Sequence, residues 1–250
     1  MNNMLNLKFK KVDIKYKKNE NAILSNVNFE IKEGEMVAFI GQSGVGKSTI
    51  FKSIVRNLKP SKGQILLNNE DIYSLNKRKW KQTIQKIGFL TQQPNLIFTD
   101  NVYNNIIRSI SQYKNKFYSL FSIITKQQKI NIFEQLANLN ILDKSFYRVS
   151  ELSGGQQQRV EIAKLLIKKA ELILADEPTS SLDFQTSLEV LDILKDLNKR
   201  NGLTIIVIIH DLNLVKKYFD RVIAFKNNTI ILDKETKDIE QWQILQAVQK

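Results

Sequence analysis

The apolar positions at the start of the chain follow a period of two. They alternate with polar residues over 5–16 and again over 27–31, a pattern typical of an antiparallel sheet with one solvated face. The alternation loses its phase at Lys10-Lys11 and resumes at Val12. Residues 36–40, in contrast, are all apolar and end at a glycine-rich turn, which predicts a strand buried on both faces.

Helical spacing begins after that turn. Apolar residues from Ile50 to Leu58 fall on one helical stripe, and we expect this helix to end at Lys59-Pro60. Residues 101–147 carry no strong strand pattern and predict a mostly helical insertion. Strands that alternate with helices indicate a parallel α/β sheet. The other expected elements are strands at 64–67, 87–91, 172–175 and 203–209, a helix over 186–199, and a hairpin of 221–225 with 229–232 around Asn227-Asn228.

Composition excludes several classes of function. The 250 residues are 42% hydrophobic and 25% charged, which are ordinary globular values. There is no Cys and only one His, so disulfide scaffolds, thiol nucleophiles and cysteine or histidine metal clusters are excluded. No apolar run approaches the ~20 residues of a membrane-spanning helix. The first residues lack the apolar core of a signal peptide, so we expect a cytoplasmic protein.

The net charge of +13 leaves two interpretations open. It could attract polyanions such as nucleic acid, an anionic membrane or nucleotides, or it could reflect a generally lysine-rich composition. The only dense basic cluster is residues 77–81, and the other lysines are scattered. Charge alone therefore does not decide the function.

Residues 41–49 lie between the buried strand and the first helix and have the phosphate-loop pattern G-x-x-x-x-G-K-[ST]. Glycines allow backbone amides to curl around phosphate oxygens, and the helix that follows directs its positive end at the same anion. Lys47 adds a full charge between the β- and γ-phosphates, and the Ser48 hydroxyl can ligate Mg²⁺. This loop therefore predicts a nucleoside triphosphate site.

Residues 172–177 form an apolar strand that ends in two carboxylates. Asp176 can lie beside the Mg²⁺ bound at Ser48, and Glu177 can polarise an attacking water. Taken alone, a strand followed by two acids is more often a capped turn. Together with the phosphate loop, it indicates hydrolysis of the triphosphate.

Residues 152–156 (LSGGQ) precede a helical stripe that includes Val160 and Ala163. This run resembles the signature motif of ATP-binding cassette (ABC) ATPases, and the resemblance extends over roughly residues 5–235. It implies an α/β P-loop NTPase (RecA-like) parallel-sheet core with an N-terminal antiparallel β subdomain and an inserted α-helical subdomain. The chain, 1–250, is then one domain, in which 1–91 and 160–250 form the β subdomain and core and 92–159 the helical subdomain.

The resemblance also implies roles for single residues and an assembly. Tyr16 stacks on adenine, Gln92 (with Gln93 as a competitor) reaches Mg²⁺, and His210 contacts the γ-phosphate. Residues 180–183 resemble the D-loop, with Ser181 where Ala is usual. Two chains form a head-to-tail homodimer in which each signature covers the partner's ATP. The expected ATP and Mg²⁺ site comprises Tyr16, Gly41, Gln42, Ser43, Gly44, Val45, Gly46, Lys47, Ser48, Thr49, Gln92 and Asp176, with Glu177 and His210 as catalytic residues, Ser153, Gly154, Gly155 and Gln156 acting in trans, and Asp183 in the D-loop.

We therefore expect the energy subunit of a transporter at the cytoplasmic face of the membrane, bound to transmembrane permease subunits. An extracytoplasmic substrate-binding protein would complete an importer. The motifs, together with an extra segment over 109–130 that contains Tyr113, Phe117, Tyr118 and Phe121, are similar to the phosphonate-importer group. Two alternatives stay open: a lipoprotein-release or export cassette, and a soluble ABC ATPase acting on nucleic acid or ribosomes. Such soluble proteins usually have two cassettes or a long coiled coil, so no specific nucleic acid is expected.

The segment after Gln92 is the expected contact with a permease. Leu96, Ile97 and Phe98 are apolar although they flank a polar loop. The alternative is that these side chains anchor the helical subdomain to its own core.

Overall fold

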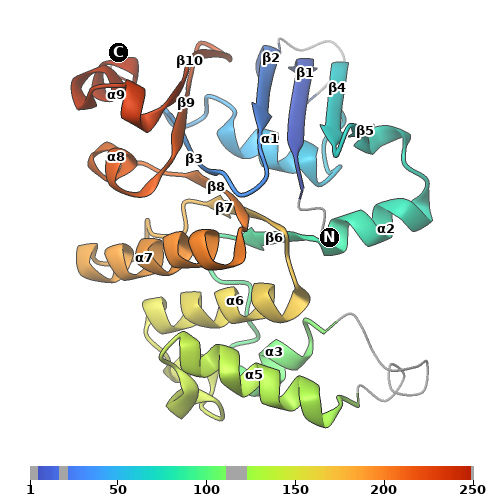
Figure 1. Cartoon of the computed structure of the whole chain (residues 1–250), viewed down its shortest axis with the longest axis vertical. Helices are drawn as coiled ribbons and strands as arrows, with labels where there is room; N and C mark the ends of the chain where they lie inside the picture. The colour runs from blue at the N-terminus through green and yellow to red at the C-terminus, as the bar shows by residue number, and fades with distance from the viewer. Residues whose placement is uncertain (1–4, 17–21, 111–122, 249–250) are drawn as a thin grey trace.

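Two β-sheets share the upper half of the molecule in the computed structural model, which describes residues 5–16, 22–110 and 123–248 (Figure 1). The first sheet is antiparallel, with the order β2 (Leu24–Ile31), β1 (Leu7–Ile14), β4 (Lys62–Leu67) and β5 (Glu70–Asp71). The second has the order β10 (Thr229–Glu235), β9 (Arg221–Lys226), β3 (Met36–Gly41), β8 (Thr204–Ile208), β7 (Leu172–Asp176) and β6 (Ile87–Leu90). From β9 to β6 its strands run parallel, and β10 returns antiparallel through the predicted hairpin. The predicted fold class is confirmed.

The phase break predicted in the first strand is a β-bulge. The register of β1 against β2 shifts between Phe9 and Val12, and Lys11 has a left-handed φ of 48°. The bulge restores the inward direction of the later side chains, so Phe9, Val12 and Ile14 are all buried.

Strand β3 separates two hydrophobic cores. Met36, Ala38 and Ile40 point into the core that includes α6, α7 and the helical insertion. Val37 and Phe39 point into the core between the second sheet, α1 and the antiparallel sheet. Every residue of β3 is buried, which confirms the prediction of a strand covered on both faces.

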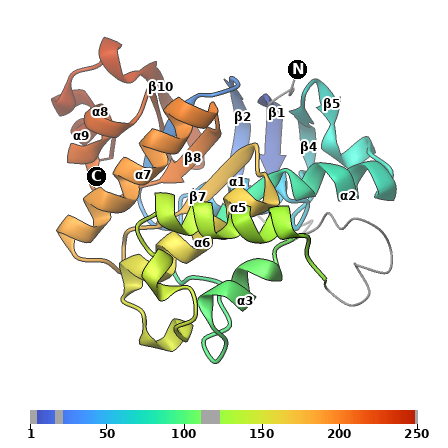
Figure 2. The ribbon, with the colours of Figure 1, turned by 60° about the horizontal axis from the view of Figure 1, so that its bottom comes forward.

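The helical insertion lies below the second sheet in Figure 1 and is reached through the loop after β6. Figures 1 and 2 both show its helix α5 beside α6. A helical insertion is confirmed for the part of residues 101–147 that the structure describes, whereas Tyr113, Phe117, Tyr118 and Phe121 lie outside the described residues. Among the described residues, the α-helices are α1 (Lys47–Ile54), α2 (Lys77–Gln85), α3 (Val102–Ile107), α5 (Lys126–Asn138), α6 (Gly154–Lys168), α7 (Phe184–Asn201), α8 (Val215–Tyr218) and α9 (Gln241–Val248).

Helix α1 ends earlier than the apolar stripe predicts, at Ile54 instead of Lys59-Pro60. The backbone amides of Asn57 and Leu58 both donate to the Lys52 carbonyl, at 2.9 and 3.3 Å, and Arg56, directly before them, has a φ of 62°. This turn closes the helix before the proline is reached. Helix α2, which covers the basic cluster, was not among the predicted elements because it carries almost no apolar stripe.

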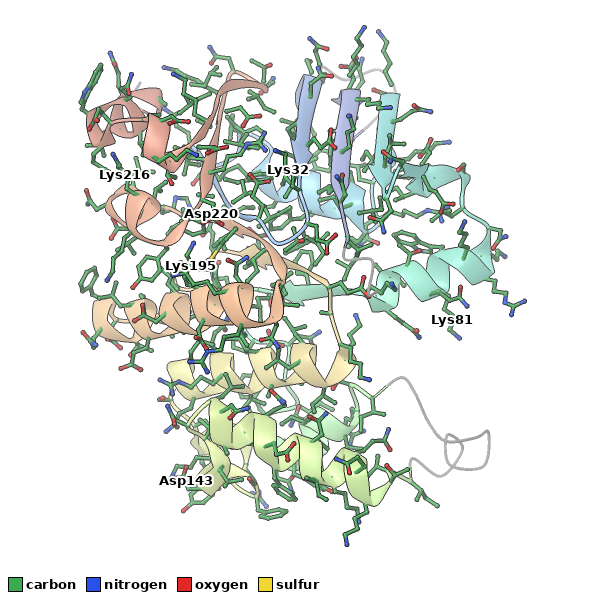
Figure 3. All side chains as sticks on the ribbon, in the orientation of Figure 1. Lys32, Lys81, Asp143, Lys195, Lys216 and Asp220 are labelled. Atoms are coloured by element: carbon green, nitrogen blue, oxygen red, sulfur yellow. The ribbon has the colours of Figure 1, made fainter. Side chains whose placement is uncertain are left out.

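The Asp220 carboxylate connects the second sheet to helix α7. Asp220 Oδ1 accepts a hydrogen bond from Lys195 Nζ at 2.7 Å, and its Oδ2 accepts one from the Met36 amide at 2.9 Å. Lys195 lies on α7 and Asp220 directly before β9, as labelled in Figure 3. These contacts fix the start of β3, and with it the direction in which the strand delivers the glycine-rich loop. Within the described ranges, no helix is both long and apolar enough to cross a bilayer.

Candidate active site

The sequence-predicted chemistry lies in loops at the carboxyl ends of adjacent parallel strands. The phosphate loop follows β3, Gln92 follows β6, Glu177 follows β7 and His210 follows β8. Parallel strands bring such loops to one edge of a sheet, which is where α/β proteins bind their ligands. Ser48, Thr91, Gln92, Gln93, Asp176 and Glu177 line one cleft at this edge.

The phosphate loop needs glycine at two of its positions. Gly41 has a φ of 146°, and a Cβ there would lie 2.5 Å from the Phe225 carbonyl oxygen. Gly46 has a φ of 106°, and its Cβ would lie 2.8 Å from Leu24 Cγ. Both the backbone conformation and the close neighbours exclude other residues, so the strands on each side set the shape of the loop.

The loop presents positive charge to an anion. No side chain of the described residues caps α1, so its first amides are available to a ligand. Lys47 is buried, and its Nζ donates to the carbonyls of Gly41 and Gln42 at 2.6 and 2.9 Å. Burial lowers the pKa of Lys47, while Glu177 and Asp176 act to raise it. A phosphate would give this ammonium group the counter-charge that burial demands.

The oxygen groups expected to hold a metal ion lie together. Ser48 Oγ donates to Asp176 Oδ1 at 3.1 Å, and both residues line the cleft with Gln92. Burial raises the pKa of the Asp176 carboxyl, and Glu177 adds to that effect, while Ser48 and Lys47 oppose it. A divalent cation would favour the ionised form, and a set of hydroxyl, carboxylate and amide oxygens suits Mg²⁺.

Glu177 is held in a strained position beside His210. Its Oε1 lies 2.6 Å from His210 Nε2, and its backbone adopts a φ of 51°, which is uncommon for a glutamate. The Ser180 hydroxyl donates to the Glu177 carbonyl at 2.9 Å and supports this turn. The carboxylate therefore faces the cleft with an imidazole as its neighbour, an arrangement that can accept a proton from water.

Tyr16 lies above helix α1. Its hydroxyl is 3.3 Å from Thr49 Oγ1, and Lys52 Nζ lies 5.8 Å from the ring centroid. The side chain is 54% exposed, so a face of the ring remains open to a planar ligand.

The signature residues do not line the cleft formed by Ser48 and Glu177. Ser153 caps α6, and its hydroxyl and the Gln156 side chain form a capping box. Gly155 is in close contact with the start of α7, where an added Cβ would lie 2.3 Å from Thr186 Cγ2. Asp183 caps α7 through the Thr186 amide at 2.9 Å. The signature and the D-loop therefore form one unit, and Gly154 lines a neighbouring cleft with Gln92 and Ser181.

Glu161 on α6 was not among the site residues predicted from the sequence. Its Oε1 accepts a hydrogen bond from the Asn95 amide at 2.8 Å, in the segment that follows Gln92. The signal available in the sequence was a single acid between the buried apolar residues Val160 and Ile162, directly after the signature.

Comparisons with known proteins agree with this geometry. A family model described as ABC transporter matches residues 24–180. The chain is 39% identical over 233 residues to the probable ABC transporter ATP-binding protein p29 of Mesomycoplasma hyorhinis, covering 93% of this chain and 92% of the relative. It is 35% identical over 235 residues to the phosphonates import ATP-binding protein PhnC 3 of Halalkalibacterium halodurans, covering 94% and 91%.

Solved structures give the same family. The chain resembles cbiO1 from Clostridium perfringens, part of the ABC transporter complex cbiONQ, with a TM-score of 0.80 and 30% identity over 93% of this chain and 89% of that one. It resembles the ATP-binding cassette MJ0796, solved as a dimer in a post-hydrolysis state with ADP and Pi, with a TM-score of 0.78 and 33% identity over 92% and 98%. The chain therefore belongs to the ABC transporter family, as an ATP-binding subunit with ATPase activity.

Proposed function

We propose that this ATPase is the energy subunit of an importer and docks on its permease through the segment after Gln92. The observation that carries the proposal is a division within three consecutive apolar residues. Leu96 is 8% exposed and belongs to the core, whereas Ile97 and Phe98 are 44% and 45% exposed. Leu96 therefore fits the alternative in which this segment anchors the helical subdomain to its own core. Ile97 and Phe98 instead offer an exposed apolar contact beside the cleft that would hold ATP.

In the proposed ATP site, Tyr16 stacks on adenine and residues 41–49 surround the phosphates. Lys47 exchanges its two carbonyl partners for phosphate oxygens, and Ser48, Asp176 and Gln92 hold Mg²⁺. The metal, when bound, neutralises charge on the phosphates. Glu177 accepts a proton from the attacking water, and His210 orients that carboxylate and contacts the γ-phosphate.

Each site needs two chains in this proposal. The signature residues Ser153–Gln156 lie at a helix N-terminus outside the cleft of their own chain, where they would meet the ATP of a partner. The MJ0796 cassette, which this chain resembles, is dimeric. Closure on ATP would bring the partner's signature and Asp183 to the nucleotide, and hydrolysis would reopen the dimer.

The substrate class we propose is a phosphonate or a similar small anion, bound outside the membrane by a separate binding protein. Support comes from relatives named phosphonate import ATP-binding proteins, one of them 38% identical over 218 residues. The cargo would contact the permease and the binding protein, while this chain supplies the ATPase.

Recovery of the tagged chain with membranes of its own cell tests the docking. We expect Ile97→Glu and Phe98→Glu to reduce membrane recovery and uptake of methylphosphonate while soluble ATPase activity stays within about twofold, because both side chains are exposed. Ile231→Glu is the matched control, since Ile231 is 46% exposed. It lies on β10, at the edge of the second sheet opposite to β6 and the segment that follows β6. Unchanged recovery for both variants would refute docking through this segment, and wild-type cells that take up no methylphosphonate would refute methylphosphonate as the cargo.

A further inference from the structure

The loop that carries Gln92 packs against one buried carboxylate, that of Glu161 on α6. It begins at Thr91, directly after β6, and reaches Asn95; we refer to residues 91–95 as the Gln92 loop. Glu161 Oε1 accepts from the Asn95 amide at 2.8 Å, and the Thr91 amide also favours the charged form of this carboxylate. Both ends of the loop therefore interact with the same side chain on α6.

Lys164, one helical turn further along α6, binds the carbonyl of the same residue, Asn95. Its Nζ donates to the Asn95 carbonyl at 2.6 Å and lies 3.5 Å from Glu161 Oε1. Asn95 is thus held through both its amide and its carbonyl by two residues spaced for one face of α6. Because α6 begins at the signature, the Gln92 loop is joined to the signature helix.

Further bonds restrict the middle of the loop. Thr91 Oγ1 donates to the Gln93 carbonyl at 2.6 Å, and Ser181 Oγ donates to the Gln92 carbonyl at 3.3 Å. Ser181 is the D-loop residue that stands where the family usually has Ala. The backbone around Gln92 is therefore fixed from α6 on one side and from the D-loop on the other.

Burial of the Glu161 carboxylate at this position costs free energy. Glu161 is 4% exposed, and its Oε2 has no hydrogen-bond partner among the described residues. The same holds for Nε2 of Gln158, one turn earlier and 1% exposed. Burial raises the pKa of Glu161 against the opposing effects of Lys164 and the two loop amides. An apolar side chain would avoid this desolvation cost, so packing alone does not account for a carboxylate here.

We propose that Glu161 is a positioning residue for ATP hydrolysis, which sets the shape of the Gln92 loop and makes it move with the signature helix. Lys164 assists by holding Asn95. Glu161 itself lies outside the cleft, so it acts on Mg²⁺ and water only through Gln92. The inference rests on the family's ATPase activity and on the proposed role of Gln92, and it is independent of the transported substrate.

Steady-state ATPase kinetics of the full chain provide the first test. Glu161→Leu removes the acceptor for both loop amides, and we expect kcat to fall about 10- to 100-fold, the loss typical of a displaced catalytic group. The KM for ATP should stay within about twofold, because the phosphate loop is untouched. Glu161→Gln retains an acceptor oxygen and should restore kcat to within about threefold of wild type.

Amide hydrogen exchange of residues 91–96 provides a second test that does not depend on activity. Glu161→Leu should accelerate exchange in this segment, while Glu161→Gln should leave it protected. Glu189→Gln is the control: Glu189 also binds α6, through Arg159 at 2.6 Å, but does not touch the loop, so kinetics and exchange should not change. If Glu161→Leu does not fold, Lys164→Met removes the bond to the Asn95 carbonyl and should give the same changes on a smaller scale.

Two results would overturn the proposal. One is a folded Glu161→Leu protein with wild-type kcat and wild-type exchange at 91–96. The other is an equal loss in Glu161→Leu, Glu161→Gln and Glu189→Gln together with a lower melting temperature, which would reduce Glu161 to a packing residue. A wild-type chain without ATPase activity would instead overturn the enzymatic assignment, and exchange would still report on the loop.

Discussion

The ammonium group of Lys47 lies in the phosphate loop and bonds to the carbonyls of Gly41 and Gln42. Lys47→Ala should weaken ATP binding about 10- to 100-fold, because hydrogen bonds to a charged group contribute roughly 1.5–3 kcal/mol. Titration calorimetry measures this, with Lys59→Ala, an exposed lysine past α1, as the control. Equal affinities for wild type and Lys47→Ala would remove Lys47 from the phosphate site.

Glu177 carries the second prediction at this scale. Glu177→Gln should bind ATP with unchanged affinity but lower kcat by at least about 100-fold, because an amide cannot accept the proton of water. His210→Ala should also slow turnover with ATP still bound, since the imidazole lies 2.6 Å from the carboxylate. Single-turnover assays check both variants. Wild-type turnover in Glu177→Gln would exclude it as the base.

Asp176 links function to stability. Burial raises its pKa in the folded, nucleotide-free protein, so folding favours the protonated carboxyl and stability falls as the pH rises through the folded pKa. Asp176→Asn should therefore raise the melting temperature at pH 7 while abolishing hydrolysis. The gain should shrink as the pH falls through that pKa, where the wild-type carboxyl is protonated as well. Asp143→Asn, at an exposed carboxylate, is the control, and a lower melting temperature for Asp176→Asn at pH 7 would contradict the account.

Residue chemistry was predictable where a motif fixes both the residue type and its place. Ser48 and Asp176 are 128 positions apart, yet each lies at the carboxyl end of a buried strand or in the loop and helix that follow one, and the structure brings their side chains to 3.1 Å. Glu161 was not predictable in the same way. Its role depends on which loop crosses α6, and a hydrophobic pattern does not contain that information.

Among the elements, helices α6 and α7 approach so closely that no side chain fits at Gly155. Gly155→Ala should destabilise the protein by about 1–3 kcal/mol, because its Cβ would lie 2.3 Å from Thr186 Cγ2. The better helix propensity of Ala, up to about 1 kcal/mol, is too small to offset this clash. Thermal unfolding should show a melting temperature several degrees lower.

A second substitution tests the cause of that loss. Thr186→Ser removes the methyl group but keeps the hydroxyl that donates to Asp183 Oδ2 at 2.6 Å. The next nearest atom, Thr186 Cβ, would lie 3.7 Å from the added Cβ, an ordinary contact. The double variant should therefore regain wild-type stability. If it melts as low as Gly155→Ala alone, the clash is not the cause.

Elements were predictable from periodicity where one face is buried. The bulge at Lys11 was visible as a change of phase, and β3 as a continuous apolar run. The end of α1 was not, because Leu58 continues the stripe and packs on the same core from a turn. Helix α2 has polar residues on most of its surface, so its signals were the cap at Asn76 and one apolar pair, Trp80 and Ile84.

On the scale of the whole molecule, the phosphate loop and the signature helix do not line the same cleft. The first follows β3 and lines the cleft of Ser48 and Asp176, while the second starts α6 beside the D-loop. In the proposed dimer, a chain built this way would supply half of each of two ATP sites. The head-to-tail dimer was predicted from the sequence through the family resemblance. The separation of the two motifs within one chain was not, because it depends on how the helical insertion sits.

Mixing two defective chains tests this central claim most directly. A Ser153→Arg chain keeps its phosphate loop, and a Lys47→Ala chain keeps its signature, so their mixed dimer has one intact site and one that is doubly defective. We predict ATPase activity in the mixture well above that of either homodimer. As a control, Ser153→Arg mixed with the Ser153→Arg/Lys47→Ala chain should remain inactive, since no site is intact. Mixed dimers that form but show no more activity than the homodimers would contradict ATP sites shared between two chains.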